Sequence, residues 1–166
     1  ISKMVISSHT KDGVELAEKY KIPPIIKDII LQHHGTSLVS FFYTQALHHE
    51  DIQDNETTKT EFRYPGPKPQ FKESGILMLA DSVEAAIRSL KKPTIAKIET
   101  LIDKIFIEKI NDNQLSDCHL NMKEIGTIKE TFITIFRGMY HNRLDYNSQI
   151  DKLKKDKESF NKKLNE

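Results

Sequence analysis

Residues 72–90 read KESGILMLADSVEAAIRSL, and this stretch decides the fold class. Apolar residues recur along it every three to four positions, which is the period of an α-helix. The stripe consists of Ile76, Leu79, Ala80, Val83, Ile87 and Leu90. Further apolar residues stand on the opposite side, at Leu77, Met78 and Ala85, beside Asp81. A helix that is apolar on nearly all sides is expected at the centre of a helical bundle.

Two more helices are predicted downstream. The first begins at Pro93-Thr94 and closes at Asn111-Asp112-Asn113, and the second covers about residues 122–140. Their inward-facing residues should be Ile98, Leu101, Ile102, Ile105 and Phe106, then Ile125, Ile128, Phe132, Ile135 and Phe136. No stretch shows the alternation of a strand, so the sequence predicts an all-α bundle with a single domain.

Three helices are predicted upstream. Residues 14–20 form an amphipathic run, which Pro23 ends. Pro24 is suited to the first turn of the next helix, and Gly35 stands where the glycine after a helix C-terminus is expected. A third helix should cover about residues 37–47.

Two segments depart from this pattern. Residues 50–72 have no periodicity and contain the run Tyr64-Pro65-Gly66-Pro67-Lys68-Pro69, so a long loop is predicted there. Residues 147–166 are lysine-rich and should form a helical or disordered tail, with a short coiled coil between protomers as the alternative. Because no helix-start signal precedes the first apolar residues, we expect a fragment truncated at its N-terminus.

Composition excludes several classes of protein. The formal net charge is +1, which gives no electrostatic case for duplex nucleic acid. Cys118 is the only cysteine, so a disulfide within the chain or a site of several thiolates is excluded. No apolar run reaches the roughly 18 residues of a membrane span, and no phosphate-binding glycine motif or nucleophile elbow is present.

The adjacent His33 and His34 are the sharpest candidates for chemistry. Each ring extends a row of isoleucines along the predicted helix, so both rings should point inward. The rows are Ile25-Ile29-His33 and Ile26-Ile30-His34. Buried imidazoles need partners for their ring nitrogens, and two neighbouring metal ions would supply them. The alternative is that the rings cap the C-terminal turn, where the helix dipole favours a cationic histidine.

Asp81 and His9 are candidates of the same kind. Asp81 stands in an apolar helix, where a metal, a helix end or an ion pair with Arg88 would remove the cost of burying its charge. His9 ends a short apolar stretch, and its alternative is a core histidine with satisfied hydrogen bonds. Imidazole and carboxylate ligands suit iron, manganese or another first-row ion. The remaining histidines, His48, His49, His119 and His141, are expected at the surface.

Four motifs, in their order, resemble the HD domain of the PgpH-type proteins, which are bacterial seven-transmembrane HD phosphodiesterases. They are Ser8-His9-Thr10-Lys11-Asp12-Gly13, Gln32-His33-His34-Gly35-Thr36, Phe62-Arg63-Tyr64-Pro65-Gly66-Pro67-Lys68-Pro69 and Ala80-Asp81-Ser82-Val83-Glu84-Ala85. The resemblance covers residues 1–146 and implies an HD phosphohydrolase domain over that range. It also implies a domain on the cytoplasmic side of the cell membrane, and a homodimer is left open.

The resemblance further implies hydrolysis of cyclic di-AMP to pApA by hydroxide generated at a centre of two metals, iron or manganese. The metal ligands would be His9, His33, His34 and Asp81, with His34 and Asp81 as the catalytic pair. Glu84 is further expected to hold the ligands or the phosphate in place without binding metal itself. Five other residues are expected to contact the substrate. These five are Lys11, Arg63, Tyr64, Lys68 and Arg88.

The sequence departs from the family pattern in one respect. It contains no His-Asp dipeptide, since His49 is followed by Glu50 and His141 by Asn142. The resemblance places that dyad on the N-terminal side of His9, so this chain alone is expected to bind metal weakly. Two alternatives stay open, namely an HD hydrolase acting on another nucleotide and a non-catalytic helical module that binds a ligand.

Overall fold

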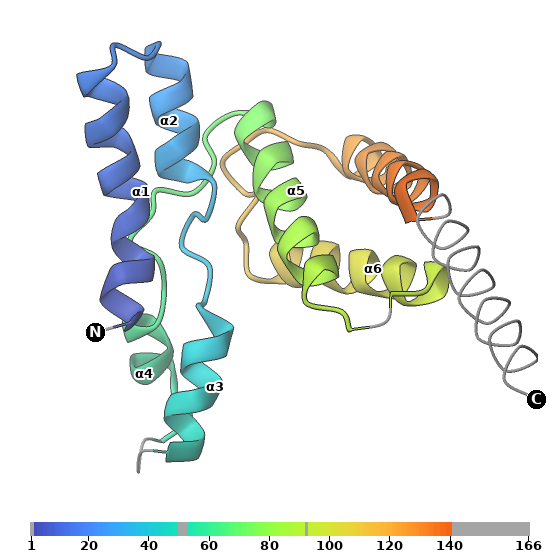
Figure 1. Ribbon diagram of the computed structural model, residues 1–166, viewed down its shortest axis with the longest axis horizontal. Helices are drawn as coiled ribbons and strands as arrows, with labels where there is room; N and C mark the ends of the chain where they lie inside the picture. Colours follow the sequence, from blue (N-terminus) through green and yellow to red (C-terminus); the bar gives the residue numbers. More distant parts are fainter. Residues whose placement is uncertain (1, 50–52, 92, 141–166) are drawn as a thin grey trace, which may run out of the picture.

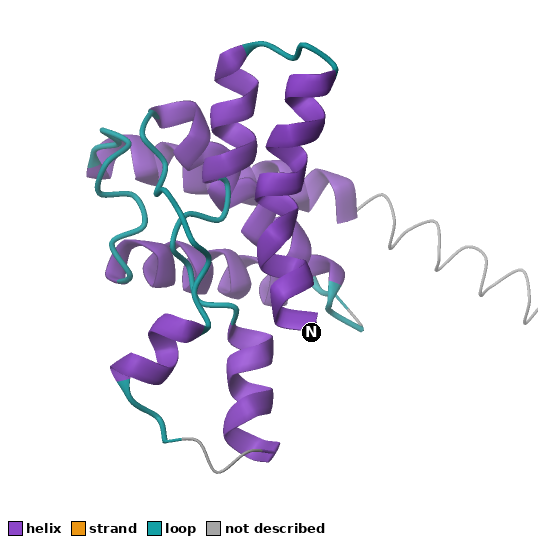
Figure 2. Ribbon diagram, turned by 90° about the vertical axis from the view of Figure 1, so that its left-hand side faces the viewer, coloured by secondary structure: helices purple, strands orange, loops and turns teal. Residues whose placement is uncertain are grey.

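The computed structural model describes residues 2–49, 53–91 and 93–140, and the regular elements within these ranges are helices (Figures 1 and 2). They are α1 (Ser2–Lys19), α2 (Pro24–Gln32), α3 (Ser40–His49), α4 (Glu56–Glu61), α5 (Lys72–Arg88) and α6 (Ile95–Asn111), followed by a helix over residues 122–140. The all-α prediction is therefore confirmed. Within the same ranges, no helix has both the length and the apolar character that a membrane span requires.

The core lies where α5 packs against α6 and the helix over residues 122–140. Leu79, Val83 and Ile87 of the predicted stripe are at most 1% exposed. They meet buried residues of α6, namely Ile98, Ile102, Ile105 and Phe106. Removal of these apolar side chains from water is the main stabilising contribution to this part of the fold.

Two predictions about buried faces are wrong. Leu77 is 42% exposed and Ala85 is also exposed. The prediction that α5 is buried on nearly all of its sides is therefore wrong. Ile135 of the last helix is 51% exposed. A helix that packs on one side of a core needs only one buried stripe, and apolar residues off that stripe stay in contact with water.

The first helix is longer than predicted. It begins at Ser2 instead of near residue 14 and continues through Gly13. A Cβ atom at Gly13 would lie 2.7 Å from Cγ2 of Ile30, so the glycine allows α1 to approach α2 closely. The two helices form an antiparallel hairpin (Figure 1). Tertiary packing in this hairpin outweighs the low helix propensity of glycine.

The second helix begins at Pro24 as predicted, and Gly35 has the predicted left-handed conformation with φ of 54°. The predicted inward rows are wrong at their first residues, because Ile25 is 50% exposed and Ile26 is 43% exposed. This end of α2 belongs to the hairpin tip, which projects away from α5 and α6 (Figure 1). The opposite end of α2 is the one near α5, because His34, two residues beyond the helix, lies 3.5 Å from Asp81.

The predicted loop over residues 50–72 contains a short helix, α4, which corrects the prediction. Asn55 caps it, because its side chain accepts a hydrogen bond of 2.9 Å from the N–H of Thr58. An asparagine before Glu56 is a recognisable helix start, but the prolines that follow α4 dominate the composition of the segment. Residues 62–71 are irregular as predicted, while residues 50–52 and the predicted tail over 147–166 lie outside the described residues.

Candidate metal centre

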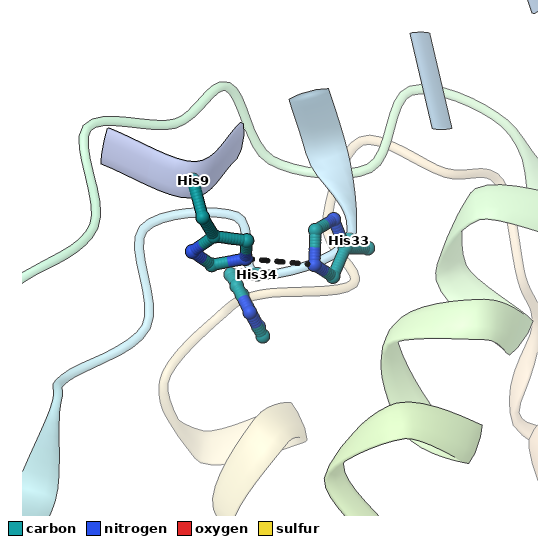
Figure 3. Close-up of side chains that lie close together, drawn as sticks. All are labelled: His9, His33 and His34. Atoms are coloured by element: carbon teal, nitrogen blue, oxygen red, sulfur yellow. Dashed lines mark hydrogen bonds between the residues drawn. The ribbon is translucent and has the colours of Figure 1, made fainter. Parts of the chain in front are cut away.

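Three imidazole rings from two helices meet in one cluster (Figure 3). His9 comes from α1, His33 is the C-cap residue of α2, and His34 follows it. One ring nitrogen from each residue can be chosen so that all three lie within 4.8 Å of one another. The Nε2 atoms of His9 and His33 are 3.3 Å apart. The antiparallel hairpin of α1 and α2 therefore places donors distant in sequence around one point.

Asp81 adds a carboxylate from α5 to this cluster. Its Oδ2 atom lies 3.5 Å from Nδ1 of His34. The side chain of His34 is 20% exposed and that of Asp81 is 41% exposed, so the carboxylate is the more accessible of the two groups. The four residues predicted as metal ligands thus lie together. Their ligation of metal remains a prediction.

His33 has the hydrogen-bonding pattern of a metal-binding histidine. Its Nδ1 atom lies 2.7 Å from the carbonyl oxygen of Ile30. A carbonyl only accepts hydrogen bonds, so Nδ1 carries the proton and Nε2 of the neutral ring presents its lone pair toward His9. Ligating histidines usually donate their second ring N–H to a backbone carbonyl or a carboxylate in this way. Imidazole nitrogens and a carboxylate also match the donors that first-row divalent ions accept, so the residues fit such a metal.

Tyr64 closes one side of the cluster. Its ring stacks on His34 with centroids 4.3 Å apart and an interplanar angle of 22°, and it meets His9 edge-on at 6.1 Å. Burial raises the pKa of the Tyr64 phenol, and the charge of Asp81 raises it further. The phenol is therefore neutral at physiological pH. The predicted contact between Tyr64 and substrate remains a prediction, but its ring does border the site.

His34 is an uncharged ring in this environment. Burial lowers its pKa to about 3, and the neighbouring His33, His9 and Lys109 lower it as well. Its contact with Asp81 is therefore a contact between a neutral imidazole and a carboxylate, not an ion pair. A neutral imidazole keeps a lone pair for metal binding.

We expect the metal-free protein to lose stability on acidification through His34. Between about pH 3 and pH 6.5 the unfolded chain protonates this histidine and the folded chain does not. The free energy of unfolding therefore rises with pH across this window and reaches its full value above it. Urea unfolding from about pH 4 to pH 7 should give a shallower pH dependence for His34→Gln, by up to about 1.4 kcal/mol per pH unit. Equal slopes for His34→Gln and wild type would contradict this expectation. His48→Gln, at an exposed position of α3, is the control.

A second group of contacts holds the segment that follows the histidines. Arg63 donates to both carboxylate oxygens of Asp112, at 2.8 and 2.9 Å, and to the carbonyl of Thr36 at 2.8 Å. Gln114, which is 1% exposed, accepts from the N–H of Thr36 at 2.9 Å and donates to Oγ1 of Thr36 at 3.0 Å. Thr36 stands two residues after His34. These bonds therefore fix the backbone that carries the histidine pair.

Arg63→Lys is expected to lower the free energy of unfolding by about 1–2 kcal/mol, because an ammonium cannot reproduce the two-pronged contact with Asp112. Thermal and urea unfolding measure the loss. The control is Arg137→Lys, since Arg137 pairs with Glu99 but is 58% exposed and its replacement should change stability by less than about 0.5 kcal/mol. An equal effect at both positions would contradict the role given to Arg63.

The other predicted residues lie apart from the cluster or make other contacts. Lys68 donates to Oγ of Ser116 at 3.4 Å, and Lys11 is exposed on α1. Glu84 and Arg88 pair with each other at 3.4 Å on the exposed side of α5, with side chains 52% and 77% exposed. The alternative in which Arg88 pairs with Asp81 is therefore wrong. Their predicted roles toward substrate and ligands remain predictions.

Lys109 is a neighbour of the cluster that sequence analysis missed. It is half-buried in the last turn of α6, and its charge acts on His34. In the sequence it is one of three lysines on α6, with Lys97 and Lys104, and nothing local distinguishes it from them. A lysine near a helix C-terminus is also an ordinary finding on exposed surfaces.

Comparison with known proteins gives consistent results. The sequence model of the HD domain family matches residues 1–86. The chain is 46% identical over 154 residues to the cyclic-di-AMP phosphodiesterase PgpH of Bacillus subtilis, and 42% identical over 150 residues to the PgpH of Listeria monocytogenes. It also resembles the crystal structure of the L. monocytogenes PgpH HD domain, with a TM-score of 0.76 and 43% identity. The same domain in complex with cyclic-di-AMP matches with a TM-score of 0.76 and 42% identity.

These matches cover most of this chain but a smaller share of the matched proteins. They cover 93% and 90% of this chain but only 21% and 20% of the two curated relatives. The crystal structures match 84% of this chain, and the matched region is 64% and 63% of theirs. This chain therefore spans about a fifth of the length of the curated relatives.

Proposed function

This chain belongs to the HD domain family, and on that premise we propose that it is part of a metal-dependent phosphodiesterase that hydrolyses cyclic di-AMP to the linear dinucleotide pApA. The supporting relatives are named cyclic-di-AMP phosphodiesterases, and one matching crystal structure is a complex with cyclic-di-AMP. These names belong to the relatives, and the activity is carried to this chain as a proposal.

The observation that carries the proposal is the convergence of four side chains from three helical segments. His9, His33 and His34 present ring nitrogens within 4.8 Å of one another, and Asp81 lies 3.5 Å from His34. Such a set is costly for a fold to assemble without a partner, because the partly buried rings of His33 and His34 lose hydration beside a carboxylate. A pair of divalent cations would compensate each of these groups.

In the proposed reaction, one water is added across one phosphodiester bond. The water oxygen forms a new bond to phosphorus while the bond from phosphorus to the ribose 3′ oxygen breaks. The leaving oxygen takes up a proton, which gives a 5′-phosphate and a 3′-hydroxyl. Divalent metals, when bound, polarise phosphoryl oxygens and lower the pKa of water toward neutrality.

The residues of the chain would orient and hold that centre. The carbonyl of Ile30 fixes the tautomer of His33, so Nε2 is the ligand atom. His34 stays neutral at physiological pH and can donate its lone pair, while Asp81 supplies the negative charge. We propose that turnover depends most on His34 and Asp81, because these two candidate ligands lie next to each other, 3.5 Å apart.

Several finer statements belong to the same proposal. The ions would be iron or manganese, which accept nitrogen and oxygen donors in roughly octahedral geometry. The longer protein would be anchored in the cell membrane with this domain on the cytoplasmic side. Cyclic di-AMP would be the ligand, and self-association into a homodimer is a separate question for solution measurements.

The test is metal analysis together with turnover of cyclic di-AMP. It is made on this chain and on a longer protein in which this sequence is joined to a His-Asp dyad, because residues 1–166 contain no such dipeptide. We expect two iron or manganese ions for each copy of the longer protein, and pApA as the product.

Two outcomes would redirect the proposal. Turnover of guanosine tetraphosphate or a deoxynucleoside triphosphate in place of cyclic di-AMP would keep the hydrolase and change the substrate. Tight binding of cyclic di-AMP without metal and without any product would instead identify a non-catalytic binding module.

A further inference from the structure

Lys109 makes an unusual contact for a lysine of α6. Its side chain is half-buried, and Nζ donates a hydrogen bond of 2.7 Å to Oγ of Ser37. Ser37 itself is only 6% exposed. An ammonium carries three N–H donors, so this one described bond leaves donor capacity on Nζ. In the described part of the chain no carboxylate oxygen lies within ion-pairing distance of Nζ.

Ser37 connects this ammonium to the histidine cluster. The N–H of Ser37 donates to the carbonyl of His34 at 3.1 Å, and the carbonyl of Ser37 accepts from the N–H of Tyr64 at 3.0 Å. Lys109 therefore bonds to a residue whose backbone is tied both to His34 and to Tyr64, the residue whose ring stacks on His34. Its charge lowers the pKa of His34, and the charge of Asp81 acts in turn on Lys109.

The acidic neighbours of Lys109 already have other partners. Asp112 is bound on both oxygens by Arg63, and Glu108 pairs with Lys104 at 3.7 Å. Burial lowers the pKa of Lys109 even though Asp112, Asp81 and Glu108 raise it. An incompletely paired ammonium in a half-buried position is costly. It is also unfavourable beside a site for metal cations, because like charges repel. An anionic ligand would remove both costs.

We propose that Lys109, held in place by Ser37, contacts a non-bridging phosphate oxygen of the substrate beside the metal-binding cluster. This inference rests on the proposed function and names a phosphate subsite within it. The proposal gives the positively charged contact with phosphate to Lys109 in place of Lys11 and Lys68. Lys11 is exposed on α1, and Lys68 bonds to Ser116. Lysine is a common ligand for phosphate, which it binds as a compact point charge.

The charge of Lys109 predicts effects of opposite sign on two ligands. In the longer protein that carries the His-Asp dyad, Lys109→Met should weaken binding of inorganic phosphate to the Mn²⁺-loaded form by about tenfold or more, as expected for loss of a charged hydrogen bond. It should also raise KM for cyclic di-AMP. The affinity for Mn²⁺ alone should stay the same or increase, because a repelling cation has been removed. Calorimetry measures phosphate binding, and electron paramagnetic resonance measures Mn²⁺ binding.

Two further variants separate charge from structure. Lys109→Arg keeps a cation and should stay within about threefold of wild type for phosphate. Lys97→Met removes a charge from an exposed position in the first turn of the same helix, and it should change neither affinity. Thermal unfolding of each variant reports whether the fold is retained.

The subsite is overturned if Lys109→Met binds phosphate as wild type does, or if its Mn²⁺ affinity, phosphate affinity and thermal stability all fall together. It is also overturned if the Mn²⁺-loaded wild type binds no phosphate. Failure of the proposed function looks different. In that case cyclic di-AMP is not hydrolysed, while phosphate binding still depends on Lys109 and the subsite stands.

Discussion

Replacing His34 by alanine or Asp81 by asparagine is expected to lower cyclic di-AMP turnover by at least about a thousandfold, with the helical fold retained. Each change removes a donor from the cluster in which His34 and Asp81 lie 3.5 Å apart. The metal contribution to an in-line displacement is several kcal/mol, and each 1.36 kcal/mol is a factor of about ten in rate. Turnover is measured on the longer protein that carries the His-Asp dyad.

Two controls make this result interpretable. His48→Ala removes an exposed histidine of α3 and should leave turnover and metal content unchanged. Circular dichroism and thermal unfolding show whether His34→Ala and Asp81→Asn remain folded. Full activity in either folded variant would remove that residue from the ligand set, and full activity in both would end the metal-centre interpretation.

Gly35→Ala is expected to lower the free energy of unfolding by about 2–4 kcal/mol. Gly35 has φ of 54°, and a Cβ atom there would lie 2.5 Å from Oε1 of Gln114 and 2.7 Å from Cε of Met78. Oε1 of Gln114 is held by the N–H of Thr36 and cannot move away without losing that bond. Left-handed backbone strain and overpacking therefore add to each other.

The same substitution should also weaken metal binding, because Gly35 follows His34 directly and any shift of its backbone moves the ring. Urea unfolding measures the first effect, and Mn²⁺ titration of the folded variant measures the second. Gly126→Ala is the matched control. No heavy atom lies within 4 Å of the added methyl at this helical position, so it should stabilise the protein by up to about 1 kcal/mol. Equal stabilities for the two variants would contradict the role given to Gly35.

Helix positions were largely predictable from the sequence. Pro93-Thr94 predicts the start of α6, and the side chain of Thr94 does accept from the N–H of Lys97. Gly35 predicts the left-handed residue after α2. These signals depend on residues a few positions apart, whose interactions form whatever the rest of the chain does. The extent of α1 through Gly13 was not predictable in this way, because close packing on Ile30 stabilises it.

The candidate ligands were also predictable from residue type and position along the chain. A histidine pair at a helix end and a carboxylate in an apolar helix are conspicuous, since burial of such groups needs a partner. The structure added that His9, His34 and Asp81 lie at one place. It also showed that Arg88 pairs with Glu84 at the surface, so the alternative ion pair between Arg88 and Asp81 is wrong.

The sequence by itself determined the helical class, most helix ends and the four residues worth testing. Each of these depends on the chemistry of residues that are close together in the sequence and on the spacing between them. Only the tertiary structure decided which side chains support them. Arg63 reaches Asp112 across 49 positions, and Lys109 reaches Ser37 across 72. Such contacts depend on the path of the whole chain, which is set by the packing of α5, α6 and the last helix, and no short window of sequence contains that information.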